Sequence, residues 1–394
     1  MGSDMSGNKK TTNKRKPLGP QLASEQYSEL NATFYSSAGP TEYVRARQQS
    51  IIFTLSDGDE AADILKKGVQ YGALHGGASA RMPQESRLRY AFLDSTVLVH
   101  HAGESLMRLW LAHMNFPLCP WIKVASVTEP GEFKRQAAKF AEPDTSHVDR
   151  KTVASVFLGG ETAEEAGVEM NQETWEDSIE GIIELLRVVA HRLTNENALY
   201  NAAKHGLVGI PGDQGEIQWD DHRMVGGPGI TYLESRRDGK SNPRQFSMWV
   251  TSTFTSLEGN LLLIELIIRA THSLWSVARR KYIGLPGDLV LVSRDEVYAT
   301  VAIGLIRDER HLVDWSQKLP TYTYETGQRK IANAEFHMNA IGLGDDVLEA
   351  SDRLNGRPAE PTFVDLPLRA GDERTPSKST RSLFSFSPAG SSSV

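Results

Sequence analysis

The segment Tyr200-Asn201-Ala202-Ala203-Lys204-His205-Gly206 contains three side chains that could do chemistry together: an amide, an ammonium and an imidazole. Histidine has a pKa near neutral pH, so His205 suits general acid or base catalysis. Lys204 supplies a cation that could contact a phosphate group. The sequence therefore predicts a candidate catalytic site of Asn201, Lys204 and His205, with Tyr200 as a supporting residue.

A structural explanation covers part of the same segment. Basic residues in the last turn of a helix interact favourably with the negative end of the helix dipole, and Lys204 and His205 would occupy that turn. Gly206 is the residue type expected in the left-handed conformation just after a helix. This explanation leaves out Tyr200 and Asn201, which lie one turn earlier, where a stronger helix former would serve better.

In three predicted helices an acid precedes a histidine by seven residues, which places both side chains on one face. The three pairs are Asp94 and His101, Glu184 and His191, and Glu265 and His272. Three interpretations are open: solvent-facing or salt-linked stripes, a polar network that lines a site, or a metal site. Di-iron bundles need the order Glu-x-x-His, and His101-x-x-Glu104 has the reverse order. We expect neither a metal nor another cofactor.

The elements that would position these residues are mainly helices. Helices are predicted at Arg87–Asn115, at Asn171–Leu193, in a shorter run that ends at His205, and at Ser256–Ile283. The last of these is apolar over most of its circumference, with a narrow polar stripe that includes Glu265 and His272. A helix of this kind is expected at the centre of its domain.

Strands are predicted in two places. Gln48–Leu55 has the β-branched and aromatic content of a strand and is followed by a predicted helix to about Tyr71. Residues 207–255 alternate in polarity as an antiparallel β-meander does, with Asp238-Gly239 as a hairpin turn. Residues 288–350 are predicted to be further helix with at most one strand. The expected fold class is mainly α: a helical bundle with an inserted antiparallel β-meander and disordered tails.

Composition divides the chain into four regions. They are a disordered basic arm at 1–24, a strand-helix segment at 25–86, the helical bundle with its β insertion at 87–350, and a disordered Pro/Ser-rich tail at 356–394. Residues 1–16 contain five Lys or Arg and one Asp, a net charge of +4, so the remaining chain carries −11 of the formal net charge of −7. An acidic body disfavours sequence-independent binding of nucleic acid, so any contact with RNA must be local.

The cellular location is predicted from what the sequence contains. Cys119 is the single cysteine, so no intrachain disulfide can form, and the basic N-terminus lacks the apolar stretch of a signal peptide. The most apolar run, Leu261–Ala270, is about half as long as a membrane span and contains two charged residues. We expect a soluble, cytoplasmic protein that does not enter a membrane.

The spacing of Asn201 and His205 resembles the Arg-Asn-x-x-x-His motif of the HEPN superfamily of helical proteins, with Tyr200 in place of the arginine. The resemblance covers this motif and the helical layout of residues 87–283. It implies a metal-independent ribonuclease or toxin, and a motif that meets its copy across a homodimer. The missing arginine puts the phosphate-binding cation in doubt. Candidates to replace it are Lys204, Arg187, Arg192 and the hairpin cluster Arg236, Arg237, Lys240 and Arg244.

Two hypotheses of different classes follow. The first is a HEPN-like helical protein with an RNA-processing or defence-related role, in which RNA contacts a local basic patch. Its catalytic residues would be Asn201, Lys204 and His205, and the supporting residues would be Tyr200, His101, Glu104, His191, Arg192, Glu265 and His272. The second is a non-catalytic interaction or assembly protein, with structural polar stripes and tails that dock a protein partner.

Overall fold

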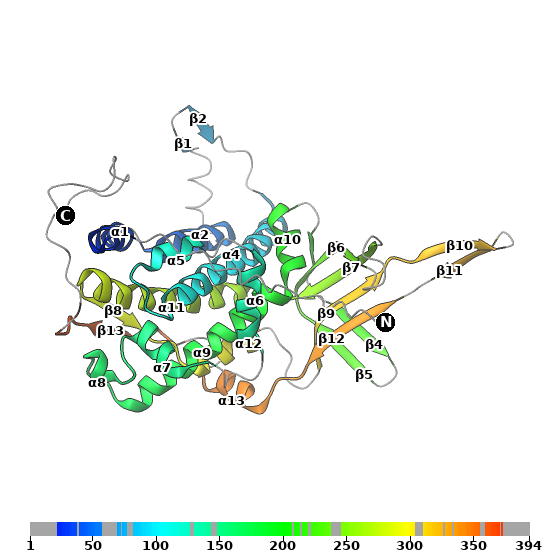
Figure 1. Cartoon of the computed structure of the whole chain (residues 1–394). Coiled ribbons are helices and arrows are strands. Elements are labelled where there is room, and N and C mark those ends of the chain that lie inside the picture. The colour runs from blue at the N-terminus through cyan, green and yellow to red at the C-terminus, as the bar shows by residue number, and fades with distance from the viewer. Residues whose placement is uncertain are drawn as a thin grey trace, which may run out of the picture.

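The structure is a computed structural model of the chain. It describes residues 22–37, 39–56, 69–71, 73–76, 82–126, 130–142, 148–206, 209–212, 215–219, 222–237, 246–303, 310–325, 328–332, 335–354, 359–370 and 372. These residues form a mainly helical body from which a sheet projects (Figure 1). The predicted basic arm falls largely outside them.

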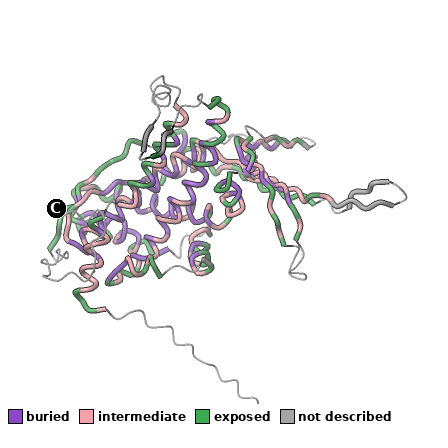
Figure 2. Tube along the Cα trace, turned by 90° about the horizontal axis from the view of Figure 1, so that it is seen from above, coloured by how far each residue is buried: buried purple, intermediate pink, exposed green. Residues whose placement is uncertain are grey.

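Three long helices form the centre of the body: α4 (Gln84–His113), α9 (Gln172–Asn195) and α11 (Leu257–Ile283). All three confirm the predicted helical runs. Asn171 caps α9 by accepting a hydrogen bond from the Thr174 backbone, and Ser256 caps α11 in the same way from Gly259. The apolar faces of the three helices meet in one continuous core, which appears as the buried centre of Figure 2.

Helix α11 is long and apolar enough to cross a membrane by length and composition, but 78% of its most apolar window is buried inside the protein. It packs against α1 (Ser24–Ser36), α2 (Pro40–Leu55), α4 and α12 (Arg294–Ala302). A helix at the centre of its domain has this character, as its sequence pattern predicts.

The N-terminal part of the body corrects one prediction. Gln48–Leu55, predicted as a strand, is the second half of helix α2 (Pro40–Leu55), which follows α1 (Ser24–Ser36). The buried residues of α2 are Val44, Gln48 and Ile51. They lie on one helical face because they recur every three or four residues, so burial against the core outweighs the β propensity of the segment. The predicted helix up to Tyr71 lies mostly outside the described residues, and its end is strand β1 (Val69–Tyr71).

Shorter helices complete the body. They are α5 (Pro120–Ser126), α6 (Pro130–Phe140), α7 (Arg150–Val153), the π-helix η1 (Ala154–Leu158), α8 (Ala163–Ala166), α10 (Asn197–His205), α12 (Arg294–Ala302) and α13 (Asp345–Arg353). Gly206 follows α10 with a φ of 63°, the left-handed conformation predicted for it.

A mixed seven-stranded sheet projects from the body. Its strands are β3 (Gly209–Gly212), β4 (Gly215–Trp219), β5 (His222–Gly226), β6 (Gly229–Arg237), β7 (Phe246–Phe254), β9 (Arg310–Lys318) and β12 (Phe336–Ile341). Their order is β3-β6-β7-β9-β5-β4. β12 is not part of this order and also pairs with β9. β5 and β9 run parallel, whereas the other neighbours are antiparallel.

The sheet is larger than the predicted meander. Its first five strands lie within the predicted 207–255, but β9 and β12 come from 288–350, which was predicted to be helical. β12 pairs with β9, and β9 itself pairs with a distant segment: Thr251 of β7 is paired with Ser316 of β9, 65 positions along the chain. A local pattern does not reveal such a partner. The predicted Asp238-Gly239 turn lies outside the described residues.

Three small two-stranded sheets accompany the main one. β1 pairs with β2 (Leu74–Gly76), β10 (Thr321–Glu325) with β11 (Gln328–Ala332), and β8 (Gly287–Val290) with β13 (Phe363–Leu366). β13 corrects the predicted disordered tail, which was expected from residue 356, because β13 pairs with β8 and Leu366 is fully buried.

A second, smaller hydrophobic core joins the sheet to the body. Helix α10 contributes Leu199, Ala202 and Ala203 to it, and β6 contributes Ile230 and Tyr232. The other members are Phe92, Leu93 and Val97 of α4. Helix α10 therefore packs between α4 and the base of the sheet. This packing fixes the position of the polar residues at the ends of α10.

Candidate functional site

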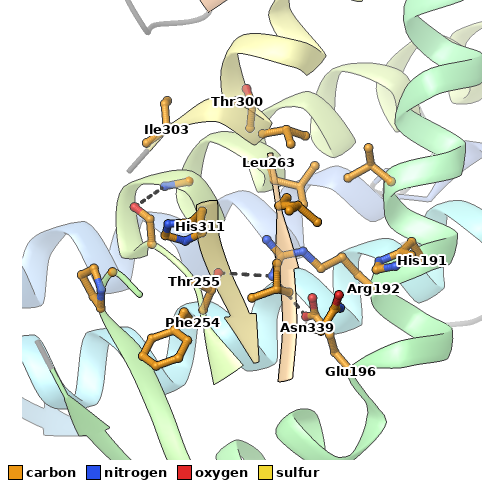
Figure 3. Close-up of a pocket in the computed structure, with 18 of the residues that line it drawn as sticks. His191, Arg192, Glu196, Phe254, Thr255, Leu263, Thr300, Ile303, His311 and Asn339 are labelled. Atoms are coloured by element: carbon orange, nitrogen blue, oxygen red, sulfur yellow. Dashed lines mark hydrogen bonds and ion pairs between the residues drawn. The ribbon is translucent and has the colours of Figure 1, made fainter. Parts of the chain in front are cut away.

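A cavity of about 340 Å³ lies where the helical body meets the sheet. The end of α9, the start of α11 and the end of α12 form its helical walls, and β7, β9 and β12 form the other side (Figure 3). The size is in the range of small-molecule sites. No single segment of the sequence contains the cavity, since its walls come from residues 187 to 341.

Arg192 is the central cation of the cavity. Its Nη1 donates to Glu196 Oε2 at 3.1 Å and to Thr255 Oγ1 at 3.3 Å. Thr255 in turn donates to Asn260, which is 1% exposed. Among the described residues, none accepts a hydrogen bond from Nε or Nη2 of Arg192, so these donors are available to a ligand in the cavity.

Glu196 lies between the two helices α9 and α10 and balances the charge of Arg192. Burial would raise the pKa of its carboxyl group, but Arg192 and His100 outweigh burial and lower the pKa to about 2. The Nε2 atom of His100 lies 3.7 Å from the carboxylate. Glu196 is therefore ionised near neutral pH.

Two buried polar atoms in the wall of the cavity have no hydrogen-bond partner among the described residues. They are Nδ1 of His311 on β9 and Oγ1 of Thr300 on α12, and each residue is only 5% exposed. Burial lowers the pKa of His311, so its ring is neutral near pH 7. Buried polar groups are almost always paired, which makes these two atoms candidates to contact a ligand.

Apolar side chains surround these polar groups. Val188, Leu263, Phe254 and Ile303 line the cavity, together with Val301, Val313 and Ile341. Ser256 and Gly259 also line it, so the N-terminal end of α11 faces the cavity. The positive end of a helix dipole favours a negatively charged group there.

Arg187 supplies a second cation one turn before His191. Its Nε donates to Glu184 at 2.8 Å, and both arginine and histidine line the cavity. Glu184 is 9% exposed and belongs to one of the predicted acid-to-histidine pairs. Glu184 therefore pairs with Arg187 and not with His191, which is exposed and lines the cavity.

The predicted catalytic segment lies beside the cavity, on α10. The Tyr200 hydroxyl is 2.9 Å from Nε2 of His101, and Lys204 Nζ lies 5.2 Å from the centre of the Tyr200 ring. Burial, followed by the Arg47 charge, lowers the pKa of His101, whereas Glu104 raises it. Asn201 and His205 are exposed on the next face of the helix.

A chain of contacts joins this segment to the cavity. The ring of His100 stacks on that of Tyr200, with 4.9 Å between centroids. His100 is also the histidine that approaches Glu196 at the cavity wall. Tyr200 and His101 therefore lie next to each other, the Glu104 charge acts on both, and His191 and Arg192 lie in the adjoining cavity.

Glu265 and His272, the other two supporting residues, lie away from this group on α11. Glu265 pairs with Arg45 at 3.8 Å and with Arg269 at 3.5 Å. His272 pairs with Asp288 of β8 at 3.0 Å. The helix faces that carry the acid-to-histidine pairs therefore do not converge. Glu265 and His272 form ion pairs with other residues, as the salt-linked interpretation expects. Within the parts of the chain that the structure describes, no group of three or more His, Cys, Asp or Glu could hold a metal ion.

The two hairpin cations that the structure describes, Arg236 and Arg237, interact with groups of the sheet itself. Arg236 lies 4.5 Å from the Trp249 ring and donates to Glu234, and Arg237 lies over Phe246 on the outer part of the sheet. Lys240 and Arg244 lie outside the described residues.

Sequence reasoning missed Glu196, Thr300 and His311. Glu196 had a usable signal, because the polar run 194–197 interrupts two apolar helical runs, and a charged residue at such a break is often a partner for neighbouring helices. His311 lies on β9, in a segment predicted to be helical, and its neighbours in the cavity are set by strand pairing and by the packing of helices against the sheet.

Comparisons of the chain with protein-family models, with curated proteins and with solved structures found no match. The function is therefore inferred from the geometry of the site.

Proposed function

We propose that the protein binds a small amphipathic anion in the cavity between the helical body and the sheet. The ligand has an apolar body and one carboxylate or phosphate group. The observation that carries the proposal is the pair of buried, unpaired polar atoms, His311 Nδ1 and Thr300 Oγ1, in the wall of a cavity that also has apolar side chains and Arg192 in its lining.

The charge and the shape of the cavity support this ligand class. Arg192 has donors to spare, and the start of α11 favours negative charge at the same wall. A planar guanidinium suits the two oxygens of a carboxylate or phosphate. The apolar side chains would contact the rest of the molecule, and the neutral His311 ring would exchange a hydrogen bond with its polar end.

Isothermal titration with two probe anions, octanoate and phenyl phosphate, tests the proposal against the neutral probes octanol and phenol. We expect at least one anion to bind and both neutral probes to bind more weakly. Thr300→Val should weaken binding of the anion about fivefold to tenfold, because it removes one hydrogen bond to the ligand. The same variant should leave the free protein as stable or more stable, since an unpaired buried hydroxyl is removed.

Thr194→Val is the matched control. Thr194 lies on α9 outside the cavity lining, and its hydroxyl already donates to the Ala190 carbonyl at 2.9 Å. This variant should bind the probe anion as the wild type does. Failure of both anions to bind, or equal affinity in Thr300→Val, would contradict the proposal.

A second function is proposed for the neighbouring surface of α10: cleavage of RNA without a metal, by a protein that resembles the HEPN superfamily. It is favoured by the cluster of Tyr200, His101 and Lys204, beside which Asn201 and His205 are open to solvent. His205 would act as the acid or base, and Lys204 would contact the phosphate.

The RNA proposal predicts that His205→Ala lowers the rate of cleavage of a fluorogenic RNA at least about a hundredfold, as loss of a general acid or base does. Lys204→Ala should also lower it, and EDTA should not. Lys139→Ala removes an exposed lysine of α6 and serves as the control for net charge. Rates that are the same in all these proteins would rule the reaction out.

We also propose, from the sequence, that the protein is cytoplasmic, that it contacts RNA or a protein partner, and that it forms a homodimer.

A further inference from the structure

Arg47 of α2 is a partly buried cation that pairs with no carboxylate among the described residues. Its Nη1 donates to the hydroxyl of Tyr43, one turn earlier on the same helix, at 3.1 Å. Arg47 comes three residues after Val44 and four before Ile51, and both of these are buried against the body. Residues at these spacings share one side of a helix, so the guanidinium lies at the edge of the packed face of α2.

Helix α4 connects this cation to the polar cluster of α10, because both α2 and α10 pack against α4 (Figure 1). The Nε2 atom of His101 on α4 is 2.9 Å from the Tyr200 hydroxyl. Burial lowers the pKa of His101, and the charges of Arg47 and Lys204 lower it too, whereas Glu104 raises it. Cations from two different helices therefore act on one imidazole ring.

Lys204, like Arg47, has no carboxylate partner among the described residues. Its ammonium lies 5.2 Å from the centre of the Tyr200 ring. Glu104, the acid that acts on this cluster, already pairs with Arg108 at 2.7 Å. The formal net charge of the chain is −7, so the positive charge of Arg47 and Lys204 is a local feature of this surface.

These two cations would contribute differently to the binding of a phosphate. A guanidinium offers two parallel donors to two phosphate oxygens, whereas an ammonium acts as a point charge. The motif on α10 supplies only the ammonium, that of Lys204, next to Asn201 and His205, which are open to solvent. Arg47 is the guanidinium that acts on the same cluster from α2.

We propose that Arg47 and Lys204 together bind a phosphate group of RNA, and that Arg47 supplies the guanidinium that the motif on α10 lacks. This inference rests on the RNA-cleavage function proposed for the same surface. Arg47 is more than a hundred residues from the motif in the sequence, and the packing of α2 and α10 on α4 brings the two together. The phosphate is thereby held beside the helix that carries His205, the proposed acid or base.

A fluorescein-labelled oligonucleotide of 2′-O-methyl RNA tests the assignment, because it presents phosphates but lacks the hydroxyl that cleavage would use. Arg47→Gln should weaken its binding, measured by fluorescence anisotropy, about tenfold or more, since a charge-assisted pair is lost. Arg47→Lys should give an intermediate affinity, because it keeps the charge without the planar fork. The salt dependence of binding, as the slope of log K against log salt concentration, should become less steep by about 0.7 in Arg47→Gln.

Arg45→Gln is the matched control, because it removes one positive charge from the same helix. Arg45 is exposed and pairs with Glu265 at 3.8 Å, and it lies two positions from Arg47, on another side of α2. This variant should bind the oligonucleotide as the wild type does. In nuclear magnetic resonance titrations, the pKa of His101 should rise in Arg47→Gln and stay unchanged in Arg45→Gln.

Three results would overturn the assignment: no binding of the oligonucleotide by the wild type, unchanged binding in Arg47→Gln, or an equal loss in both glutamine variants. Cleavage of a fluorogenic RNA separates the assignment from the function on which it rests. If the wild type and Arg47→Gln cleave equally fast, Arg47 is not the phosphate-binding cation, although the reaction stands. If neither cleaves RNA but binding depends on Arg47, the phosphate site stands and the reaction does not.

Discussion

Glu196 is the residue on which the contacts of the main cavity depend. It accepts a hydrogen bond from Arg192, lies 3.7 Å from His100, and sits between α9 and α10. A buried carboxylate is tolerated only if it is paired, and one whose partner is removed leaves an uncompensated charge. The ion pair therefore maintains the position of the guanidinium that we propose to bind the ligand.

Glu196 should make the stability of the protein depend on pH. Its pKa is about 2 in the folded protein and near 4.5 when unfolded, so the folded state is favoured above pH 4.5 and loses this contribution as the pH falls toward 2. The difference corresponds to on the order of 3 kcal/mol. Urea unfolding between pH 7 and pH 3 should show Glu196→Gln to be less stable at pH 7, with a difference that narrows in acid.

Glu349→Gln is the control for this experiment. Glu349 is exposed on α13, and its ion pair with Arg353, at 3.6 Å, lies at the surface. Its stability should follow that of the wild type at each pH. A Glu196→Gln protein with the same dependence on pH as the wild type would show that the pair does not stabilise the fold.

The position of α9 relative to α12 depends on one glycine. A Cβ atom on Gly181 would lie 2.1 Å from the carbonyl oxygen of Val292, so α9 lies directly against the backbone that leads into α12. These two helices carry Arg187, Arg192 and Thr300 of the cavity. The close contact thus sets the width of the cavity as well as the packing of the body.

Gly181→Ala should lower the free energy of unfolding by about 2 kcal/mol or more, because the methyl group meets backbone that cannot move aside. Gly131→Ala on α6 is the matched control, since a Cβ atom there has nothing within 4 Å. This second variant should be neutral or more stable by up to about 1 kcal/mol, from helix propensity. Chemical denaturation measures both, and equal effects would show that the contact at Gly181 is relaxed at little cost.

At the scale of the molecule, the sheet is anchored at its base and free at its far end. β6 packs on α10 and α4, whereas β10 and β11 pair with no other described strand than each other and extend beyond the rest of the sheet (Figure 1). Side chains on the outer sheet, such as Phe336 at 53% and Met248 at 44% exposure, are apolar and uncovered by described residues. The helical body therefore accounts for most of the buried core.

Replacing residues 321–332 with a short Gly-Ser linker should change the free energy of unfolding by less than about 1 kcal/mol, because the hairpin adds no strand to the main sheet. The binding of the probe anion in the main cavity should also be retained. Deletion of β12 should instead destabilise the protein, since β12 pairs along β9 and lines the cavity. A hairpin deletion that unfolds the protein would mean that β10 and β11 support the sheet.

The sequence by itself determined the three central helices and the end of α10. The 3.6-residue period placed α4, α9 and α11, and Gly206 marked the end of α10, because these signals arise from residues three or four apart. Its prediction that Asn201, Lys204 and His205 form a catalytic site stays a prediction.

Only the tertiary structure decided where β9 and β12 lie, that Gln48–Leu55 is helical, and that Glu265 and His272 lie apart from the other polar residues. His311 and Thr300 become neighbours of Arg192 through strand pairing and helix packing across more than a hundred residues of sequence. Contacts over such separations depend on which surfaces are buried together, and that information is not contained in local residue patterns.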